Sequence, residues 1–289
     1  MTQTPSDLAR EMMLEQRRHI AWPTLFASIA LIGLFAFAVF GHLGGFVPLW
    51  LASLLAFISI HMSFAVAHEA THKTISNNAT SPLLDNALGT IHSWMLLYDF
   101  PTFKFLHLRH HANTNDPEHD PDYWLQNVTI PTGLFLGLFV PLHYLRMFII
   151  ATVKKHVYTK VAFWSFVRIA VLMAVLIALL IIAPIETFFL WLAPSSIASS
   201  IISVSHRLLH TAEQTSDRKQ TTLIVHGEKL WEFVVSPFFW LNNHHFLHHE
   251  YPKLPCYTHE KLFAKTKDQL AADGVQIIAF GKSGNESNS

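Results

Sequence analysis

The stretch FVPLWLASLLAFISIHMSFAVAHEATH, residues 46–72, decides the fold. Residues 46–66 carry no formal charge, and as a helix they are about long enough to cross ~30 Å of hydrocarbon. Two histidines follow at once, His68 and His72. Because residues four apart share one face of a helix, both imidazoles can point to a common position just beyond the apolar run. The stretch therefore predicts a membrane-spanning helix that ends in metal-ligand residues.

The composition supports a membrane protein. Of 289 residues, 51% are hydrophobic and only 14% are charged, and the mean hydropathy is +0.30. The net charge of zero and the pI near 7.4 argue against nucleic-acid binding. A single cysteine excludes an internal disulfide and a four-cysteine iron–sulfur cluster. The sequence has no glycine-rich dinucleotide motif and no C-x-x-C-H haem motif, so a redox metal here would need electrons from another protein.

Four membrane spans are expected. An uncharged run at 22–40 precedes the first stretch, and the short segment 41–45 forms a turn between the two. The apolar region 161–204 is roughly twice as long as the membrane is thick, so it must fold back on itself. The residues Ala183-Pro184-Ile185-Glu186 are the simplest turn, because proline interrupts a helix and glutamate favours water.

The basic residues predict the orientation. If 41–45 and 183–186 are the outer turns, all lysines and arginines lie on the other side or at its border, which is then cytoplasmic, with both termini. Arg168, near the start of the third span, is expected to reach back to that face. The apolar run 130–153 should lie in the interface or re-enter, because a further crossing would separate the histidine groups. The stretch 87–97 is interpreted in the same way.

The predicted fold class is an all-α integral membrane protein: four transmembrane helices with a cytoplasmic helical cap that carries the metal site. The cap should include a polar helix near Thr258–Ala272. The predicted segments are a cytoplasmic N-terminal segment (1–21), transmembrane helices 1 and 2 (22–66), a cytoplasmic or interfacial region with two histidine groups (67–160), transmembrane helices 3 and 4 (161–205), the cap with the third group (206–280) and a disordered tail (281–289).

Two further histidine groups repeat one spacing, H-L-R-H-H at 107–111 and H-F-L-H-H at 245–249. Adjacent residues of a helix point about 100° apart, so the last two histidines of each group can serve different metals. A first-row metal accepts at most about six ligands, so these groups require two metals. The predicted ligands are His68, His72, His107, His110, His111, His245, His248 and His249.

His206 and His210 form another pair four residues apart, at the end of the fourth span. We expect His210 to be a ninth ligand and hold His206 as possible, because helix C-termini favour histidine for electrostatic reasons alone. His244 is also possible, although it falls off the face of its group. The remaining histidines have no partner at ligand spacing and are interpreted as surface, interface or packing residues, with His92 the first exception to consider: His19, His42, His61, His92, His119, His143, His156, His226 and His259.

Polar residues near the groups could orient the ligands. Asp116, Asp120 and Asp122 could each hold the second nitrogen of a bound imidazole. Asn113, with Asn115, could cap the chain or support the site in the same way. Glu69 allows two interpretations: the base of an H-E-x-x-H zinc site, or a residue that supports a ligand.

The ordered motifs resemble the membrane fatty acid desaturase superfamily. They are H-E-A-T-H, H-L-R-H-H-A-N-T-N-D-P-E-H-D-P-D-Y-W, H-R-L-L-H-T-A-E-Q-T-S-D-R and N-N-H-H-F-L-H-H-E-Y-P, and the likeness covers about 46–257. It implies a non-haem centre of two irons on the cytoplasmic side, with O2 as co-substrate, and an additional histidine where His210 stands. One departure is Glu69, because many acyl desaturases have aspartate or arginine after the first histidine.

The resemblance favours attack on an unactivated C–H bond of a membrane lipid, most simply desaturation or hydroxylation of a fatty acyl chain. Carotenoid hydroxylases and ketolases and alkene-forming fatty acid decarboxylases belong to the same superfamily. A separate electron donor of ferredoxin or cytochrome type, with its reductase, would be the partner, and in a bacterium the inner membrane the location. The lipid would enter a slot lined by Trp94, Phe100, Phe103 and Trp124. The alternatives are a membrane zinc metalloprotease using His68-Glu69-His72 and a metal carrier without catalysis.

Overall fold

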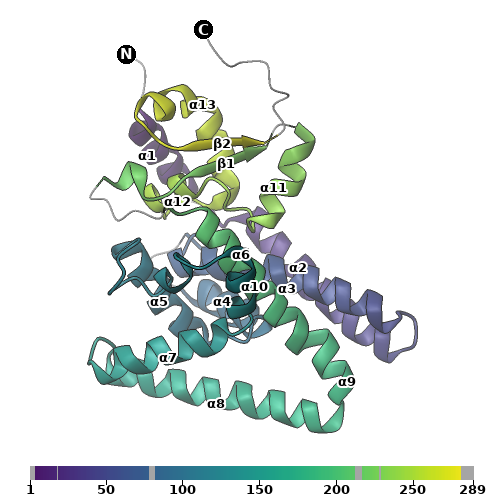
Figure 1. Cartoon of the computed structure of the whole chain (residues 1–289). Coiled ribbons are helices and arrows are strands. Elements are labelled where there is room, and N and C mark those ends of the chain that lie inside the picture. The colour runs from purple at the N-terminus through teal and green to yellow at the C-terminus, as the bar shows by residue number, and fades with distance from the viewer. Residues whose placement is uncertain (1–3, 18, 78–81, 212–216, 228, 281–289) are drawn as a thin grey trace.

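A computed structural model describes residues 4–17, 19–77, 82–211, 217–227 and 229–280, so the tail expected to be disordered lies outside the described residues. The chain is mostly helical, and long helices at one end lead into a compact group of short elements at the other (Figure 1). This arrangement places the ends of several apolar helices against the polar half of the molecule.

Four helical segments are long and apolar enough to cross a membrane, as predicted. They are α2 (Trp22–Leu43), α3 (Leu49–His72), α8 (Thr159–Ile182) and the continuous run Pro184–Leu208, which consists of α9 (Pro184–Thr187), a π-helical turn (Phe188–Leu192) and α10 (Ala193–Leu208). Much of the first and third segments faces outward, which suits contact with lipid.

Both predicted turns are present. The chain reverses direction between α2 and α3 just beyond Leu43, where Gly45 adopts a positive φ of 76°. Gly41 lies against Val47, and a Cβ added to Gly41 would lie only 2.8 Å from the Val47 side chain. α8 ends before Pro184, and α9 begins there. Figure 1 shows both turns at the end of the molecule away from α13. The two helical hairpins therefore run in the same sense.

A group of elements, here called the cap, lies at the opposite end. It contains α1 (Pro5–Gln16), β1 (Ile224–Gly227), α11 (Glu232–Phe238), α12 (His245–Glu250), α13 (His259–Ala272) and β2 (Ile277–Phe280) (Figure 1). α13 occupies the stretch that was expected to be a polar helix.

The expectation of an all-α chain was wrong in one respect. β1 and β2 pair in parallel, with Ile224 opposite Ile277 and Val225 opposite Ile278. Four-residue strands are too short to give a clear alternating pattern, and β-branched residues in so short an apolar run fit a helix end equally well. Only the contact between segments about fifty residues apart makes them a sheet.

Shorter helices connect the spans. α4 (Leu83–Met95) and α5 (Phe100–Ala112) lie between α3 and the 3₁₀ turn Tyr123–Leu125, followed by α6 (Ile130–Gly137) and α7 (Val140–Val153). α6 and α7 meet at an angle of 73°, so the apolar run 130–153 is not one straight crossing. α4 is 13 residues long, about 20 Å, which is too short to span hydrocarbon.

Arg168 makes a specific contact within the protein. Its Nε donates to Asp99 Oδ1 at 2.6 Å, and Nη2 donates to Ser165 Oγ at 3.0 Å. Asp99 is the N-cap of α5, where its other oxygen accepts from the backbone N and the hydroxyl of Thr102. This ion pair attaches α8 to the start of the helix that carries the second histidine group.

We predict that Arg168→Met destabilises the folded protein by about 2 kcal/mol, because it leaves the buried Asp99 carboxylate without its cation. The loss is reduced by the partial exposure of the arginine. Thermal unfolding of the purified protein in detergent measures it. Lys160→Met, at an exposed position of the same helix, is the control. Equal melting temperatures for the two variants would contradict the assigned role.

Candidate metal centre

Nine predicted histidines converge from four parts of the chain. They come from the end of α3, the end of α5, the residues after α10, and α12. Their potential ligand atoms form two groups, each with all atoms within 4.8 Å of one another. The first cluster is His68, His72, His107, His111 and His248. The second cluster is His110, His210, His245 and His249.

Each pair of consecutive histidines is divided between the clusters. His110 and His111 lie in different clusters, and so do His248 and His249. The cause is local, because neighbouring side chains on a helix point about 100° apart. His107 joins only the cluster of His111, although its spacing allowed contact with both. The repeated H-x-x-H-H spacing thus produces two adjoining centres rather than one.

The first cluster presents ring nitrogens to one another. The Nε2 atoms of four residues form a chain of close contacts. The distances are 2.9 Å for His72–His107, 3.0 Å for His107–His111 and 2.8 Å for His111–His248. The ring of His68 packs 4.2 Å from that of His248, and both nitrogens of His68 are buried without a hydrogen-bond partner. Buried polar atoms require partners, so this arrangement fits a cation that accepts their lone pairs.

The second cluster forms a closed ring of Nε2 atoms. The contacts run His110–His249 (3.3 Å), His249–His245 (3.1 Å), His245–His210 (3.3 Å) and His210–His110 (3.1 Å). A ring nitrogen is either a donor or an acceptor, so four such atoms satisfy at most two of the four contacts by hydrogen bonds. The four Nε2 atoms therefore face one common position, an arrangement that suits a metal ion bound by imidazoles.

The Nδ1 atoms of these histidines contact polar groups outside the ring of Nε2 atoms. His110 Nδ1 donates to Asp120 Oδ1 at 2.9 Å, and His210 Nδ1 donates to the carbonyl of His206 at 2.7 Å. His245 Nδ1 contacts the side-chain amide of Asn242 at 3.0 Å, a support that sequence reasoning missed. Such partners orient the rings and leave Nε2 as the ligand atom.

Burial keeps most of these imidazoles neutral, which is the form that binds metals. It lowers the pKa of His210 to about 3, and it lowers the pKa of His107, His111, His245, His248 and His249 well below the ordinary value. His110 is the exception. Burial opposes its protonation, but the carboxylates of Asp120 and Asp122 outweigh burial and raise its pKa.

The predicted supporting residues divide into two sets. Asp120 contacts His110 directly and is itself fixed by the backbone N–H groups of Asn115 and Asp122. Asp122 Oδ2 lies 3.9 Å from His110 Nδ1. These two carboxylates stand where ligand-orienting residues were expected.

The other three predicted supporting residues make their hydrogen bonds outside the two clusters. Asp116 accepts from the backbone of Glu118 and His119, and Asn113 donates to the carbonyl of Arg109 as α5 ends. The carboxylate of Glu69 accepts from the backbone N of Cys256 at 3.1 Å and from Thr74 Oγ1 at 2.8 Å. Their hydrogen bonds therefore stabilise turns and attach α3 to the cap, and do not orient the clustered imidazoles.

The two possible ligands differ. His206 lies beside the second cluster, its ring 4.8 Å from that of His110, with a buried Nε2 that has no hydrogen-bond partner. His244 belongs to neither cluster and faces Glu260. His92, the exception considered among the remaining histidines, hydrogen-bonds Ser28 and Ser63 between helices and is a packing residue.

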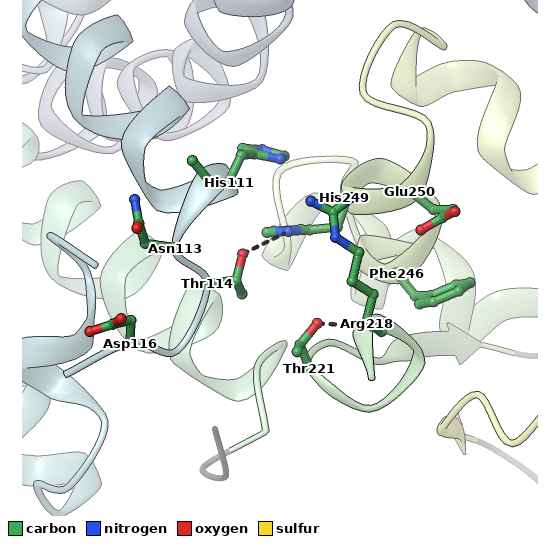
Figure 2. Close-up of a pocket in the computed structure, with 10 residues that line it drawn as sticks. His111, Asn113, Thr114, Asp116, Arg218, Thr221, Phe246, His249 and Glu250 are labelled. Carbon is green, nitrogen blue, oxygen red and sulfur yellow. Dashed lines mark hydrogen bonds between the residues drawn. The ribbon is translucent and has the colours of Figure 1, made fainter. Parts of the chain in front are cut away.

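A polar pocket of about 270 Å³ reaches both clusters from one side (Figure 2). His111 lines it from the first cluster and His249 from the second, and Arg218 lies beside them. Thr114 Oγ1 lies 3.4 Å from His249 Nδ1. The pocket connects the imidazoles to the polar surface.

On another side lies a small chamber, lined by His107, His206, Phe64, Tyr98, Asp122, Trp124, Leu125, Val140, Tyr144, Ile202 and Ser203. Tyr98 and Tyr144, whose ring centroids are 5.5 Å apart, also line an apolar groove between α5, α7 and α8. The two tyrosines therefore stand between the groove and the chamber.

The predicted slot residues are dispersed. Trp124 lines the chamber and Phe103 lines the groove. Trp94 lines a separate apolar cavity near Thr187, and Phe100 is a core residue packed tightly against Gly89, where an added Cβ would lie 2.5 Å from its ring. Sequence reasoning missed the two tyrosines because aromatic residues in or next to apolar segments are usually core or interface residues.

The fold and the site together define a membrane protein with a buried polyhistidine centre. The chain belongs to the fatty acid desaturase family, whose model matches residues 44–281. Among curated proteins, the chloroplastic omega-6 fatty acid desaturases of Brassica napus and Arabidopsis thaliana are each 37% identical over 57 residues. That segment covers 20% of this chain and only 12% of each relative.

We predict that Asp120→Asn lowers iron affinity roughly 10- to 100-fold, because the orienting partner of His110 is lost. Iron retained per chain after dialysis against a chelator measures the change. Asp116→Asn is the matched control, since its carboxylate holds only a nearby turn. Equal iron loss in both variants would show that Asp120 has no special role.

Proposed function

We propose that this protein is an O2-dependent diiron oxidoreductase that attacks an unactivated C–H bond of a fatty acyl chain. The observation that carries the proposal is the division of nine converging imidazoles into two adjoining clusters. Imidazole ligands suit iron, and a separate ligand set for each metal suits a pair. Family membership supports the same chemistry.

The ligand type fits an oxidising centre. When bound, two ferrous ions would supply the electrons that convert O2 into an oxidant able to remove hydrogen from a methylene. The residues that would hold them are imidazoles, without thiolates that such chemistry would damage. Cys256 is buried, and its sulfur faces Asn242 Oδ1 at 3.7 Å. This thiol is not one of the clustered ligands, although its sulfur lies within 4.8 Å of a ring nitrogen of His68.

The apolar groove and the chamber would bind the acyl chain. Leu142, Leu145 and Leu172 line the groove, which leads past Tyr98 and Tyr144 toward His107 and His206. Tyr98 donates to Ser199 Oγ at 2.7 Å and Tyr144 donates to Asp122 Oδ1 at 2.9 Å, so both phenols are anchored. The anchored rings would position one carbon and exclude water.

We further propose that a separate electron donor, of ferredoxin or cytochrome type, binds over the polar pocket of Figure 2. His111 and His249 approach the surface there, one from each cluster. Arg218, Asp116 and Glu250 line the same pocket, so the donor would meet charges of both signs. By the positive-inside rule this face would be cytoplasmic.

The protease alternative is disfavoured by Glu69. A glutamate base must face the metal and its water, whereas this carboxylate is occupied by Cys256 and Thr74. The metal-carrier alternative expects ligands in the middle of the spans, but here they gather at the helix ends.

We predict that expression in a bacterial host yields a new oxygen-dependent lipid product, detected by mass spectrometry, and that His111→Ala or His249→Ala abolishes it. Desaturation lowers the product mass by about 2 Da and hydroxylation raises it by about 16 Da, so the experiment also separates these reactions. The wild-type protein should contain about two irons per chain. One zinc per chain in place of the iron, or full activity in either variant, would refute the proposal.

We also predict that Val140→Phe reduces turnover of long acyl chains roughly tenfold or more while iron is retained, because it fills the chamber. Product profiles against chain length measure the effect. Leu134→Phe, at an exposed position of α6, is the control. An unchanged profile in the Val140 variant would place the substrate elsewhere.

A further inference from the structure

We propose that the cap holds a third divalent transition metal, distinct from the pair, bound by His226, His244 and Glu260, with Glu232 next to His226. Zn²⁺ is the ion that this donor set suits best. The ligand atoms of His226, His244 and Glu260 lie within 4.8 Å of one another, and none of these residues belongs to either cluster of the iron site.

The donor atoms already face a common position. His244 Nε2 lies 3.0 Å from Glu260 Oε2, and His226 Nδ1 lies 3.9 Å from that oxygen and 3.8 Å from Glu232 Oε2. Ligands of a tetrahedral zinc ion stand about 3.4 Å apart, so side-chain shifts of well under 1 Å would close the site.

One ring nitrogen of each of the two histidines has no hydrogen-bond partner. His226 Nδ1 and His244 Nε2 are buried and make no hydrogen bond, although a carboxylate is close to each. The side chain of His244 is only 4% exposed. Buried polar atoms in this state call for a further partner, and a cation between the nitrogens and carboxylates supplies it.

The surroundings hold the ligands in place. Phe263 packs against both imidazoles, with ring centroids 5.1 Å from His226 and 4.9 Å from His244. The carboxylate of Glu232 is fixed by the backbone N of Gly227 at 2.9 Å and by the amide of Asn243 at 3.1 Å. Glu260, about half exposed, closes the solvent side. The arrangement is one of positioned donors rather than a solvated ion pair.

The location gives the metal a role. Its ligands lie on β1, just before α12 and in the first turn of α13, so one ion would join three elements of the cap. His244 immediately precedes His245, a member of the second cluster. Metal binding at this position would therefore fix the start of the third histidine group, His245–His249, and slow the loss of iron.

Metal analysis of the purified full-length protein tests the inference, using iron-loaded protein incubated with Zn²⁺ and then freed of excess ion. Wild-type protein should hold one zinc beyond its iron, and Glu260→Gln and His226→Ala should each lose that zinc while keeping the iron. We also expect each variant to release iron to a chelator roughly tenfold faster. Asp268→Asn, an exposed substitution on the same helix α13, should behave as wild type.

Zinc and iron are counted separately, so this test and the test of the proposed function fail independently. Equal zinc in the wild-type protein and both ligand variants would overturn the third site, whatever the iron content. Correct folding of the variants is checked by their retained iron and by their melting temperatures.

Discussion

The structure depends on holding many neutral imidazole nitrogens against one another in a buried space. Within the two clusters, Nε2 atoms approach to 2.8–3.3 Å, although hydrogen bonds among them can satisfy only some of these contacts. Bringing such groups out of water is costly unless a metal takes up their lone pairs. The ends of the apolar helices and the adjacent cap therefore surround one buried polar region.

The membrane architecture makes this arrangement possible. Two helical hairpins of similar length end on the same side, and α3 brings His68 and His72 to that level. α5 approaches from a different direction and is attached through Asp99 to Arg168 of α8. α12 contributes its histidines from the cap. Each segment buries apolar surface by itself, and the metal-binding residues gather where their polar ends meet.

The histidine clusters have two different surroundings, one apolar and one polar. Toward α5, α7 and α8 it meets an apolar groove and a chamber bounded by Tyr98 and Tyr144. Toward the polar surface it meets the pocket that contains Arg218. Behind α12, the group of His226, His244 and Glu260 lies within the cap. The apolar groove, the polar pocket and the cap thus meet the histidine clusters on separate sides.

The sequence by itself determined the features that depend on local periodicity. Long apolar runs specify four candidate spans, and the H-x-x-H-H spacing places His110 and His111 in different clusters, because both features follow from helix geometry. Only the tertiary structure decided which Nδ1 partner each imidazole has, as with Asp120 and Asn242, and which carboxylates, such as Asp116 and Glu69, are used elsewhere. It also paired β1 with β2 and brought His226 to Glu260. Packing of the whole chain brings the residues in these contacts together, and no local sequence pattern predicts them.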